Sequence, residues 1–231
     1  MNELEQYFQH NPGSLISKWK HYFKAYDRHF SRFKGTDMVI VEIGVCHGGS
    51  LQMWKHYFGQ QARVFGVDVD PRSMAFEEER IQIIIGDQED RAFLHSLRQQ
   101  IPRIDILIDD GGHTMTQQIN TFEELFPAVS ENGIYICEDT HTSYWSSFGG
   151  GYRKPGSFIE HAKDKIDEIN AFHNKQNTEG FEITDFTKSV KSMHFYDSMV
   201  AIEKGRRGPP EIKHTGTQRL PRFRATRLPG K

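Results

Sequence analysis

Short apolar runs that alternate with amphipathic stretches constrain the fold of this chain more than any other feature. Five runs have the length and composition of buried strands: MVIVEIGV (38–45), RVFGVDV (63–69), IQIIIG (81–86), IDILID (104–109) and GIYICED (133–139). Three of the intervening stretches space their apolar residues as helices do: SLQMWKHYFG, EDRAFLHSLRQQ and MTQQINTFEELFPAV. This alternation predicts an α/β fold in which helices cover both faces of a parallel sheet.

Both ends of the chain depart from this alternation. The stretch LISKWKHYFKAYDRHFSRF predicts one or two helices that pack on the sheet or on a partner subunit, which leaves a homo-oligomer open. After the fifth strand, HTSYWSSFGGGYRKPGS predicts a long binding or lid loop, and SFIEHAKDKIDEINAFH predicts a helix. The stretch SVKSMHFYDSMVAIEK predicts two strands around a short turn. We therefore expect a doubly wound, mostly parallel, seven-stranded sheet with a C-terminal antiparallel hairpin.

Charge and hydropathy restrict the partners. No window approaches the 18 apolar residues of a membrane helix, and the first twenty residues lack the apolar core of a secretory signal, so we expect a cytoplasmic protein that does not enter membranes. From Lys204 onward the tail carries nine Lys and Arg against one acid, so the preceding residues hold 20 basic and 30 acidic side chains. The net negative charge of residues 1–203 argues against nucleic acid as the main ligand.

A glycine-rich turn follows the first strand, in the order Glu42, Gly44, Gly48 and Ser50. Glycine lets a ligand approach the backbone, and the helix that starts near Ser50 directs free N–H groups at it. The spacing matches neither the dinucleotide nor the nucleoside-triphosphate fingerprint. Because an acid at this turn repels phosphate, Glu42 favours a ligand that carries a hydroxyl, an amine or a sulfonium.

Acidic residues also end the second and third strands. Asp68 stands where an acid hydrogen-bonds a ribose diol in doubly wound folds, and Asp87 can accept a hydrogen bond from an adenine amino group. Together with the glycine-rich turn they indicate one crevice at the carboxyl edge of the sheet.

Carboxylates gather again at the ends of the fourth and fifth strands. Asp110 ends the fourth, and Glu138 and Asp139 end the fifth. If these strands are neighbours, three anions converge, and their mutual repulsion calls for protons or a cation. Oxygen ligands suit a hard ion, Mg²⁺ first. The alternative is that these residues cap helices or pair with Lys or Arg.

Two histidines lie near these acids. His113 follows Asp110 across a Gly-Gly turn, and its imidazole can take a proton from an alcohol whose acidity a metal has raised. His141, three residues after Glu138, is the rival as base or as a substrate contact. We favour His113 as the general base.

The crevice residues resemble the cofactor site of class I S-adenosylmethionine-dependent methyltransferases, whose first motif has the form acid-x-Gly-x-x-x-Gly. The resemblance implies that S-adenosylmethionine is the cofactor, held by Glu42, Gly44, Gly48, Ser50, Asp68 and Asp87. The resemblance covers a methyltransferase domain over residues 38–203. Together with the patterns at the two ends, this predicts an N-terminal helical segment (1–37) before the domain and a basic flexible tail (204–231) after it.

The motifs IDDGGH, CEDTHTSYW and FGGGY resemble more closely the Mg²⁺-dependent O-methyltransferases that modify deoxysugars on macrolides and related natural products. The resemblance implies that Asp110, Glu138 and Asp139 hold Mg²⁺ and that His113 is the base. It further implies a small-molecule glycoside as substrate. Two alternatives remain open: an O-methyltransferase of a catechol or another vicinal diol, and a non-catalytic scaffold that binds S-adenosylmethionine.

The aromatic loop after the fifth strand completes the predicted site. Tyr144 and Trp145 would stack on the sugar or the aglycone, with the FGGG segment as a hinge for a closing loop. Packing within the protein is the competing role for these two aromatic residues.

Overall fold

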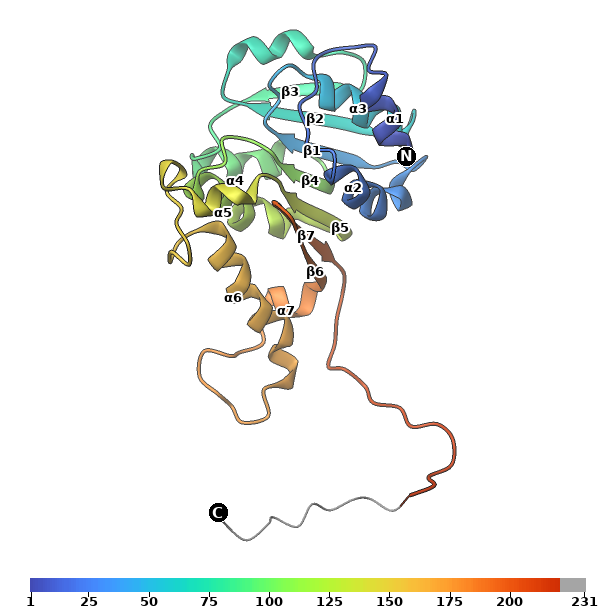
Figure 1. Cartoon of the computed structure of the whole chain (residues 1–231), viewed down its shortest axis with the longest axis vertical. Helices are drawn as coiled ribbons and strands as arrows, with labels where there is room; N and C mark the ends of the chain where they lie inside the picture. The colour runs from blue at the N-terminus through green and yellow to red at the C-terminus, as the bar shows by residue number, and fades with distance from the viewer. Residues whose placement is uncertain (221–231) are drawn as a thin grey trace.

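The computed structural model describes residues 1–220 of the chain. Seven strands form one sheet in the order β3-β2-β1-β4-β5-β7-β6 (Figure 1). The first five strands run parallel, whereas β7 is antiparallel to both β5 and β6. The predicted doubly wound sheet with its terminal hairpin is therefore confirmed. The strands are β1 Val39–Ile43, β2 Arg63–Asp68, β3 Ile81–Ile85, β4 Ile104–Asp109, β5 Val129–Cys137, β6 Val190–Tyr196 and β7 Met199–Lys204.

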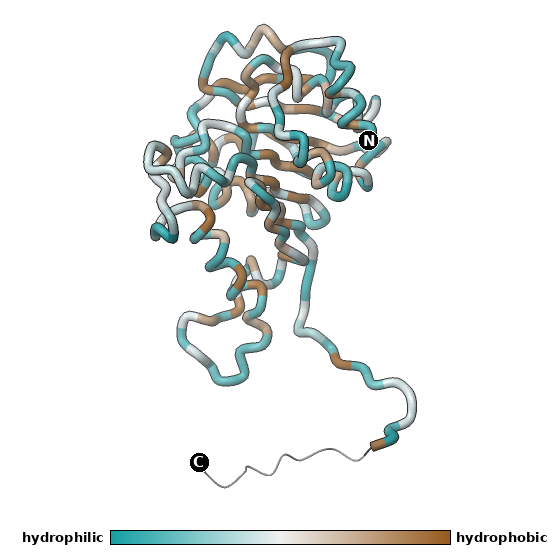
Figure 2. The backbone as a smooth tube through the Cα atoms, viewed as in Figure 1, coloured by the Kyte–Doolittle hydropathy of each residue, from teal (hydrophilic) through white to brown (hydrophobic). Residues whose placement is uncertain are grey.

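Helices cover both faces of this sheet. Strand residues alternate between two apolar clusters, as a pleated strand requires: Ile40 packs with α1, α2 and α3 on one face, and its neighbours Val39 and Val41 pack with α4, α5 and α6 on the other. Figure 2 shows hydrophobic residues concentrated along the central strands. The helices are α1 Glu3–Gln9, α2 Tyr22–Phe30, α3 Gly49–Phe58, α4 Arg91–Gln100, α5 Met115–Leu125, α6 Phe158–Asn170 and α7 Asp185–Ser189.

The N-terminal segment differs in detail from the prediction. Helix α2 begins only at Tyr22. The prediction of a helix is therefore wrong for residues 15–21. Residues 11–21 contain no helix or strand, and we call them the strap. Helix α1 comes before the strap, outside the stretch whose periodicity predicted helices, and Asn2 caps it by accepting a hydrogen bond from the Glu5 amide at 2.9 Å. Both helices bury side chains in the core.

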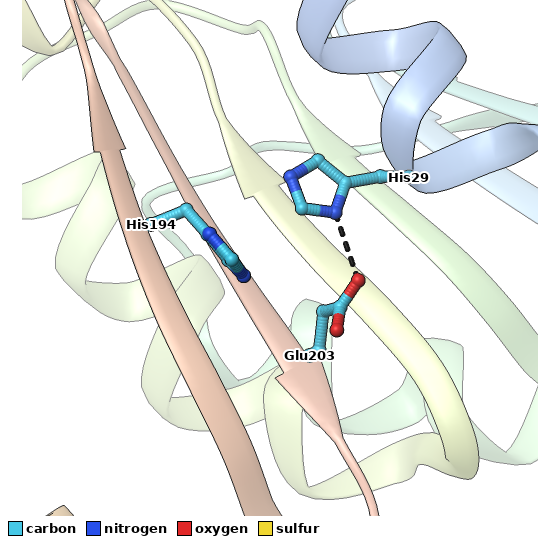
Figure 3. A group of neighbouring side chains, drawn as sticks. All are labelled: His29, His194 and Glu203. Atoms are coloured by element: carbon cyan, nitrogen blue, oxygen red, sulfur yellow. Dashed lines mark hydrogen bonds and ion pairs between the residues drawn. The ribbon is translucent and has the colours of Figure 1, made fainter.

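A polar cluster joins α2 to the terminal hairpin (Figure 3). His29 is buried, and its Nδ1 lies 2.8 Å from Oε1 of Glu203 while its Nε2 lies 2.9 Å from the Tyr196 hydroxyl. Burial lowers the pKa of His29, which favours the neutral ring that donates from Nδ1 to the carboxylate and accepts from Tyr196. His194 packs edge-on against His29. Both nitrogens of His29 already have protein partners. We therefore interpret this cluster as a structural contact that holds α2 against the hairpin.

Residues of α6, α7 and β6 hold the first residues of the tail. Arg207 donates from Nη1 to the carbonyl oxygens of Ile169 and Val190, and Gly205 donates its amide to Ser189. The tail predicted from residue 204 is thus bound at its start, and residues 221–231 lie outside the described part of the chain. Within residues 1–220, no helix combines the length and the apolar character needed to cross a bilayer.

Candidate active site

Two clefts open at the carboxyl ends of the parallel strands, beside the point where the strand order reverses between β1 and β4. Asp110 lines both clefts, so ligands in the two clefts would meet at its carboxylate. The first, of about 270 Å³, is lined by Ile43, Gly44, Cys46, Val67, Asp68, Val69, Gly86, Asp87, Gln88, Asp110, Gly111, Gly112 and Gln117. The second, of about 420 Å³, is lined by Ser17, Lys18, Trp19, Tyr22, Asp110, Glu138, Asp139 and His141.

The first cleft contains three residues of the predicted cofactor set: Gly44, Asp68 and Asp87. Asp68 also organises the loop after β1, because its Oδ2 accepts the amide hydrogens of Val45 and Cys46 at 2.8 and 3.1 Å. Asp87 accepts the amide of Glu89 through Oδ1 at 2.8 Å. Asp68 also accepts the Asp70 amide through Oδ1 at 2.9 Å. Each carboxylate oxygen offers two acceptor directions, so Asp68 retains one for a ribose hydroxyl and Asp87 retains capacity for an amino group.

Gly44 brings the loops after β1 and β4 into close contact. Its φ is +96°, and a Cβ at this position would lie 2.1 Å from the carbonyl oxygen of Asp110. Asp110 in turn donates its amide to the carbonyl of Ile43 at 2.9 Å. A glycine is therefore required here for the position of Asp110, independently of any ligand.

The other three predicted cofactor residues lie outside this cleft. Glu42 is fully buried; its Oε2 accepts the Ser50 hydroxyl at 2.7 Å and the Trp54 indole N–H at 3.1 Å. Burial raises the pKa of Glu42, and Lys18 acts against this rise. A Cβ on Gly48, which has a φ of +75°, would lie 2.7 Å from the Phe76 ring. The structure gives all three residues a role in building the turn.

Lys18, a strap residue that sequence reasoning missed, lies among three carboxylates. Its Nζ donates to Asp110 Oδ2 at 2.6 Å, to Glu138 Oε2 at 3.0 Å and to Glu42 Oε1 at 3.1 Å. Only 2% of its side chain is exposed. Burial alone would lower the pKa of Lys18, but the neighbouring carboxylates raise it well above its usual range. Lys18 is therefore a buried ammonium.

The predicted metal ligands Glu138 and Asp139 lie on different sides of Asp110. Glu138 faces Lys18, and its other oxygen accepts the Tyr26 hydroxyl at 2.6 Å. On the opposite side, atoms of Asp110, His113 and Asp139 lie within 4.8 Å of one another. The sequence argument expected three carboxylates around one ion. The structure brings Asp110 and Asp139 together at an ion-sized gap, and it turns Glu138 toward Lys18.

The backbone directs His113 and Asp139 into this gap. Both residues have positive φ, +59° and +51°, a conformation that costs energy outside glycine and clusters at functional sites. His113 Nε2 lies 3.6 Å from Asp139 Oδ2 and 3.9 Å from Asp110 Oδ1, beyond hydrogen-bonding distance. The Nδ1 atom of His113 is buried with no hydrogen-bond partner in the described chain. Nε2 is thus the atom available for proton transfer.

Aromatic side chains border the second cleft around His141. The His141 ring packs edge-on against Trp145 and Trp19, with centroid distances of 4.6 and 6.2 Å. Trp145 and Tyr144 are each 50% exposed, but neither is among the cleft-lining residues. Trp19 was not predicted to belong to the site; it is 54% exposed and lines the cleft beside Lys18.

Known proteins are similar to this chain in sequence and in fold. The chain matches the family profile described as a methyltransferase domain over residues 41–140. It is 36% identical to the 8-demethyl-8-alpha-L-rhamnosyl tetracenomycin-C 2'-O-methyltransferase of Streptomyces olivaceus, over 79% of this chain and 50% of that protein. It is 33% identical to the demethylmacrocin O-methyltransferase of Streptomyces fradiae, over 83% and 51%.

A solved structure agrees with these relatives. The MycE methyltransferase of the mycinamycin pathway, in complex with Mg, SAH and mycinamycin VI, superposes with a TM-score of 0.78 at 30% identity, over 89% of this chain and 54% of that one. The chain spans about half the length of these relatives. The resemblance expected from the motifs is confirmed: the chain matches a methyltransferase-domain profile over residues 41–140 and is similar over most of its own length to O-methyltransferases of tetracenomycin and macrolide biosynthesis.

Proposed function

We propose that this chain is an S-adenosylmethionine- and Mg²⁺-dependent O-methyltransferase that acts on a sugar hydroxyl of a glycosylated natural product. The observation that carries this proposal is the position of Asp110, which lines both clefts. The first cleft holds the ribose- and adenine-type acceptors Asp68 and Asp87, and two acids of the second, Asp110 and Asp139, lie beside His113. The methyl donor in the first cleft and the acceptor in the second would meet at Asp110. The named activities of the relatives support the same reaction.

The first cleft fits S-adenosylmethionine. Asp68 and Asp87 offer carboxylate oxygens at the ends of β2 and β3, and the backbone of Gly44 lies open beside them. The cofactor supplies a methyl group on a positively charged sulfur that leaves readily. The acidic lining suits that charge, and the chain's own task is to align the acceptor oxygen with the methyl group.

The gap beside His113 fits a hard divalent ion. Asp110 Oδ1 and Asp139 Oδ2 face it without a hydrogen-bond donor among the described residues, and carboxylate oxygens are preferred ligands of Mg²⁺. A bound ion of this kind increases the acidity of a neighbouring hydroxyl. His113 would accept the hydroxyl proton at Nε2, where the two carboxylates stabilise the imidazolium that results.

The second cleft fits a sugar. Trp19 lines it, and Trp145 packs edge-on against His141, so aromatic rings lie beside polar groups. Sugars bind such mixed surfaces through their C–H faces and hydroxyls. This arrangement favours a glycoside as acceptor.

Transfer of a labelled methyl group tests the proposal. The chain is incubated with methyl-labelled S-adenosylmethionine and a panel of deoxysugar glycosides and catechols, with Mg²⁺ or with EDTA. We expect labelled glycosides, no label after EDTA, and recovery when Mg²⁺ is returned. Labelled catechols alone would favour the vicinal-diol alternative. Cofactor binding that is indifferent to Mg²⁺, with no product on any acceptor, would favour the scaffold alternative.

Variants assign the roles. His113→Ala should lower kcat by roughly 10²- to 10⁴-fold with cofactor affinity retained, because general bases contribute about that factor. His141→Ala should mainly raise KM, since its Nδ1 is bonded to the Ser198 hydroxyl. Asp139→Asn should weaken both Mg²⁺ binding and turnover, whereas Asp164→Asn on the exposed face of α6 should change neither. The opposite order for the two histidines would exchange their roles.

A further inference from the structure

The strap is fixed against the start of α3 and carries Lys18 into the site. Ser14 donates its amide to Oε1 of Gln52 at 3.0 Å, and Ile16 is buried. A Cβ on Gly49 would lie 2.4 Å from the carbonyl oxygens of both Ser14 and Leu15, so only glycine lets the strap pass here. The position of Lys18 relative to the strand ends is therefore set by backbone packing.

Each N–H donor of the Lys18 ammonium has a carboxylate acceptor. An ammonium has three N–H donors, and Glu42, Asp110 and Glu138 each accept one of them at 3.1, 2.6 and 3.0 Å. This set of oxygen ligands would otherwise attract a hard cation. Lys18 therefore occupies a cation position that the fold builds from three strand ends.

Asp110 connects this position to the gap described above. Its Oδ2 contacts Lys18, and its Oδ1 faces His113 and Asp139. Two cation positions thus share one carboxylate, and Lys18 fills the inner one. Positive charge at the inner position opposes a divalent ion at the outer one, and it also blocks that ion from moving inward.

We propose that Lys18 is a resident cation of the site: it neutralises Glu42, Asp110 and Glu138, and it confines a divalent ion to the outer position between Asp110 and Asp139. The outer position rests on the proposed function, whereas the inner one rests on the contacts of Lys18. Lys18 is a positioning residue in this proposal. A tethered ammonium cannot be chelated, so the buried carboxylates keep their partner when the divalent ion is absent.

Replacement of the charge tests this directly. Lys18→Met keeps the length of the side chain and removes the ammonium; Lys20→Met, at an exposed strap residue, is the matched control. We measure Tm by circular dichroism in EDTA and in saturating Mg²⁺, and Mn²⁺ binding by electron paramagnetic resonance. Neither readout requires methyl transfer.

The expected changes are large. In EDTA, Lys18→Met should lower Tm by about 10 °C, because it leaves buried carboxylates unpaired. Saturating Mg²⁺ should restore more than half of this loss, and Mn²⁺ should bind at least about tenfold more tightly than to the wild type, since a repelling charge is gone. Lys18→Met/Glu42→Gln, with one carboxylate fewer, should regain part of the Tm in EDTA and lose part of the gain in Mn²⁺ affinity. Lys20→Met should match the wild type.

The outcomes separate this inference from the proposed function. Equal Mn²⁺ affinity in Lys18→Met and wild type, no Mn²⁺ binding in either, or a loss of Tm that Mg²⁺ does not repair would each overturn the inference. A Lys18→Met chain that stays unfolded in saturating Mg²⁺ would also overturn it. Tighter Mn²⁺ binding in Lys18→Met, together with no methyl transfer by the wild type, would support the inference and reject the proposed function.

Discussion

Gly44→Ala is the substitution whose cost can best be worked out from the structure. Gly44 has a φ of +96°, and an added Cβ would lie 2.1 Å from Asp110 O and 2.7 Å from Asp110 C. Backbone atoms cannot rotate away as a flexible side chain does, so the loops after β1 and β4 must separate by more than 1 Å to reach ordinary contact, about 3.4 Å. The substitution thus combines backbone strain with overpacking at the candidate site.

Gly35 separates the two contributions. It also has a positive φ, +69°, but an added Cβ would meet no atom within 4 Å. Gly35→Ala should therefore cost only backbone strain, roughly 1–3 kcal/mol. Gly44→Ala should add overpacking of about 2 kcal/mol, which lowers Tm by a further ~6 °C in a chain of this size.

Calorimetry of the two variants measures this difference, and Mn²⁺ titration and turnover measure its effect on the site. A shift of about 1 Å at a reacting group can cost 10²-fold in rate, so we expect a loss of that order for Gly44→Ala and none for Gly35→Ala. Equal Tm values for the two variants, or full Mn²⁺ affinity in Gly44→Ala, would refute the role given to the contact between Gly44 and Asp110.

Three further predictions concern other parts of the structure. Trp19→Ala should raise KM for a glycoside by roughly three- to tenfold, because an aromatic contact contributes about 1 kcal/mol, with kcat unchanged; steady-state kinetics that show a fall in kcat alone would contradict this. Tyr26→Phe removes the hydroxyl that donates to Glu138 at 2.6 Å and should lower the free energy of unfolding by about 1–3 kcal/mol in urea, whereas the same change at exposed Tyr144 should have almost no effect. Burial would raise the pKa of Glu203, but His29 and Arg32 lower it from 4.5 to about 2, so its stabilisation is complete above pH 4.5 and is lost as pH falls through about 2. Glu203→Gln should reduce the loss of unfolding free energy between pH 4.5 and about 2 by about 1 kcal/mol, allowing for the partial exposure of Glu203. An unchanged dependence of the unfolding free energy on pH would contradict the stabilisation of Glu203 by His29 and Arg32.

The sheet and its carboxyl edge could be predicted because both depend on local patterns. Apolar runs of strand length followed by acids or glycines place those residues at one edge of any parallel sheet. Of the predicted residues Asp110, Glu138, Asp139 and His113, the structure groups Asp110, His113 and Asp139. The same pattern explains the pair Asp109 and Asp110. Asp109 is the last strand residue and is buried against Gln88 and Tyr135, whereas Asp110 lies past the strand end and faces the clefts.

Lys18 could not be found in this way. Its three partners lie 24, 92 and 120 residues further along the chain, so no local spacing links them. The aromatic residues that follow it, from Trp19 onward, have helical intervals, which favoured one or two helices over 15–33. Contacts of the strap with Gln52 and Gly49 hold the residues before Tyr22 out of a helix. Tertiary contacts overrode the local preference here. Tertiary contacts also explain why the sequence placed Glu138 at the correct strand end but could not predict that its carboxylate faces Lys18.

The carboxylate that the two clefts have in common carries a thermodynamic consequence. Any occupant of one cleft that reorients or neutralises Asp110 changes the affinity of the other cleft, and the reverse effect must have the same size. Affinities of donor and acceptor measured one at a time would therefore misstate how the pair assembles. Titrating each in the presence of the other gives the coupling free energy between them.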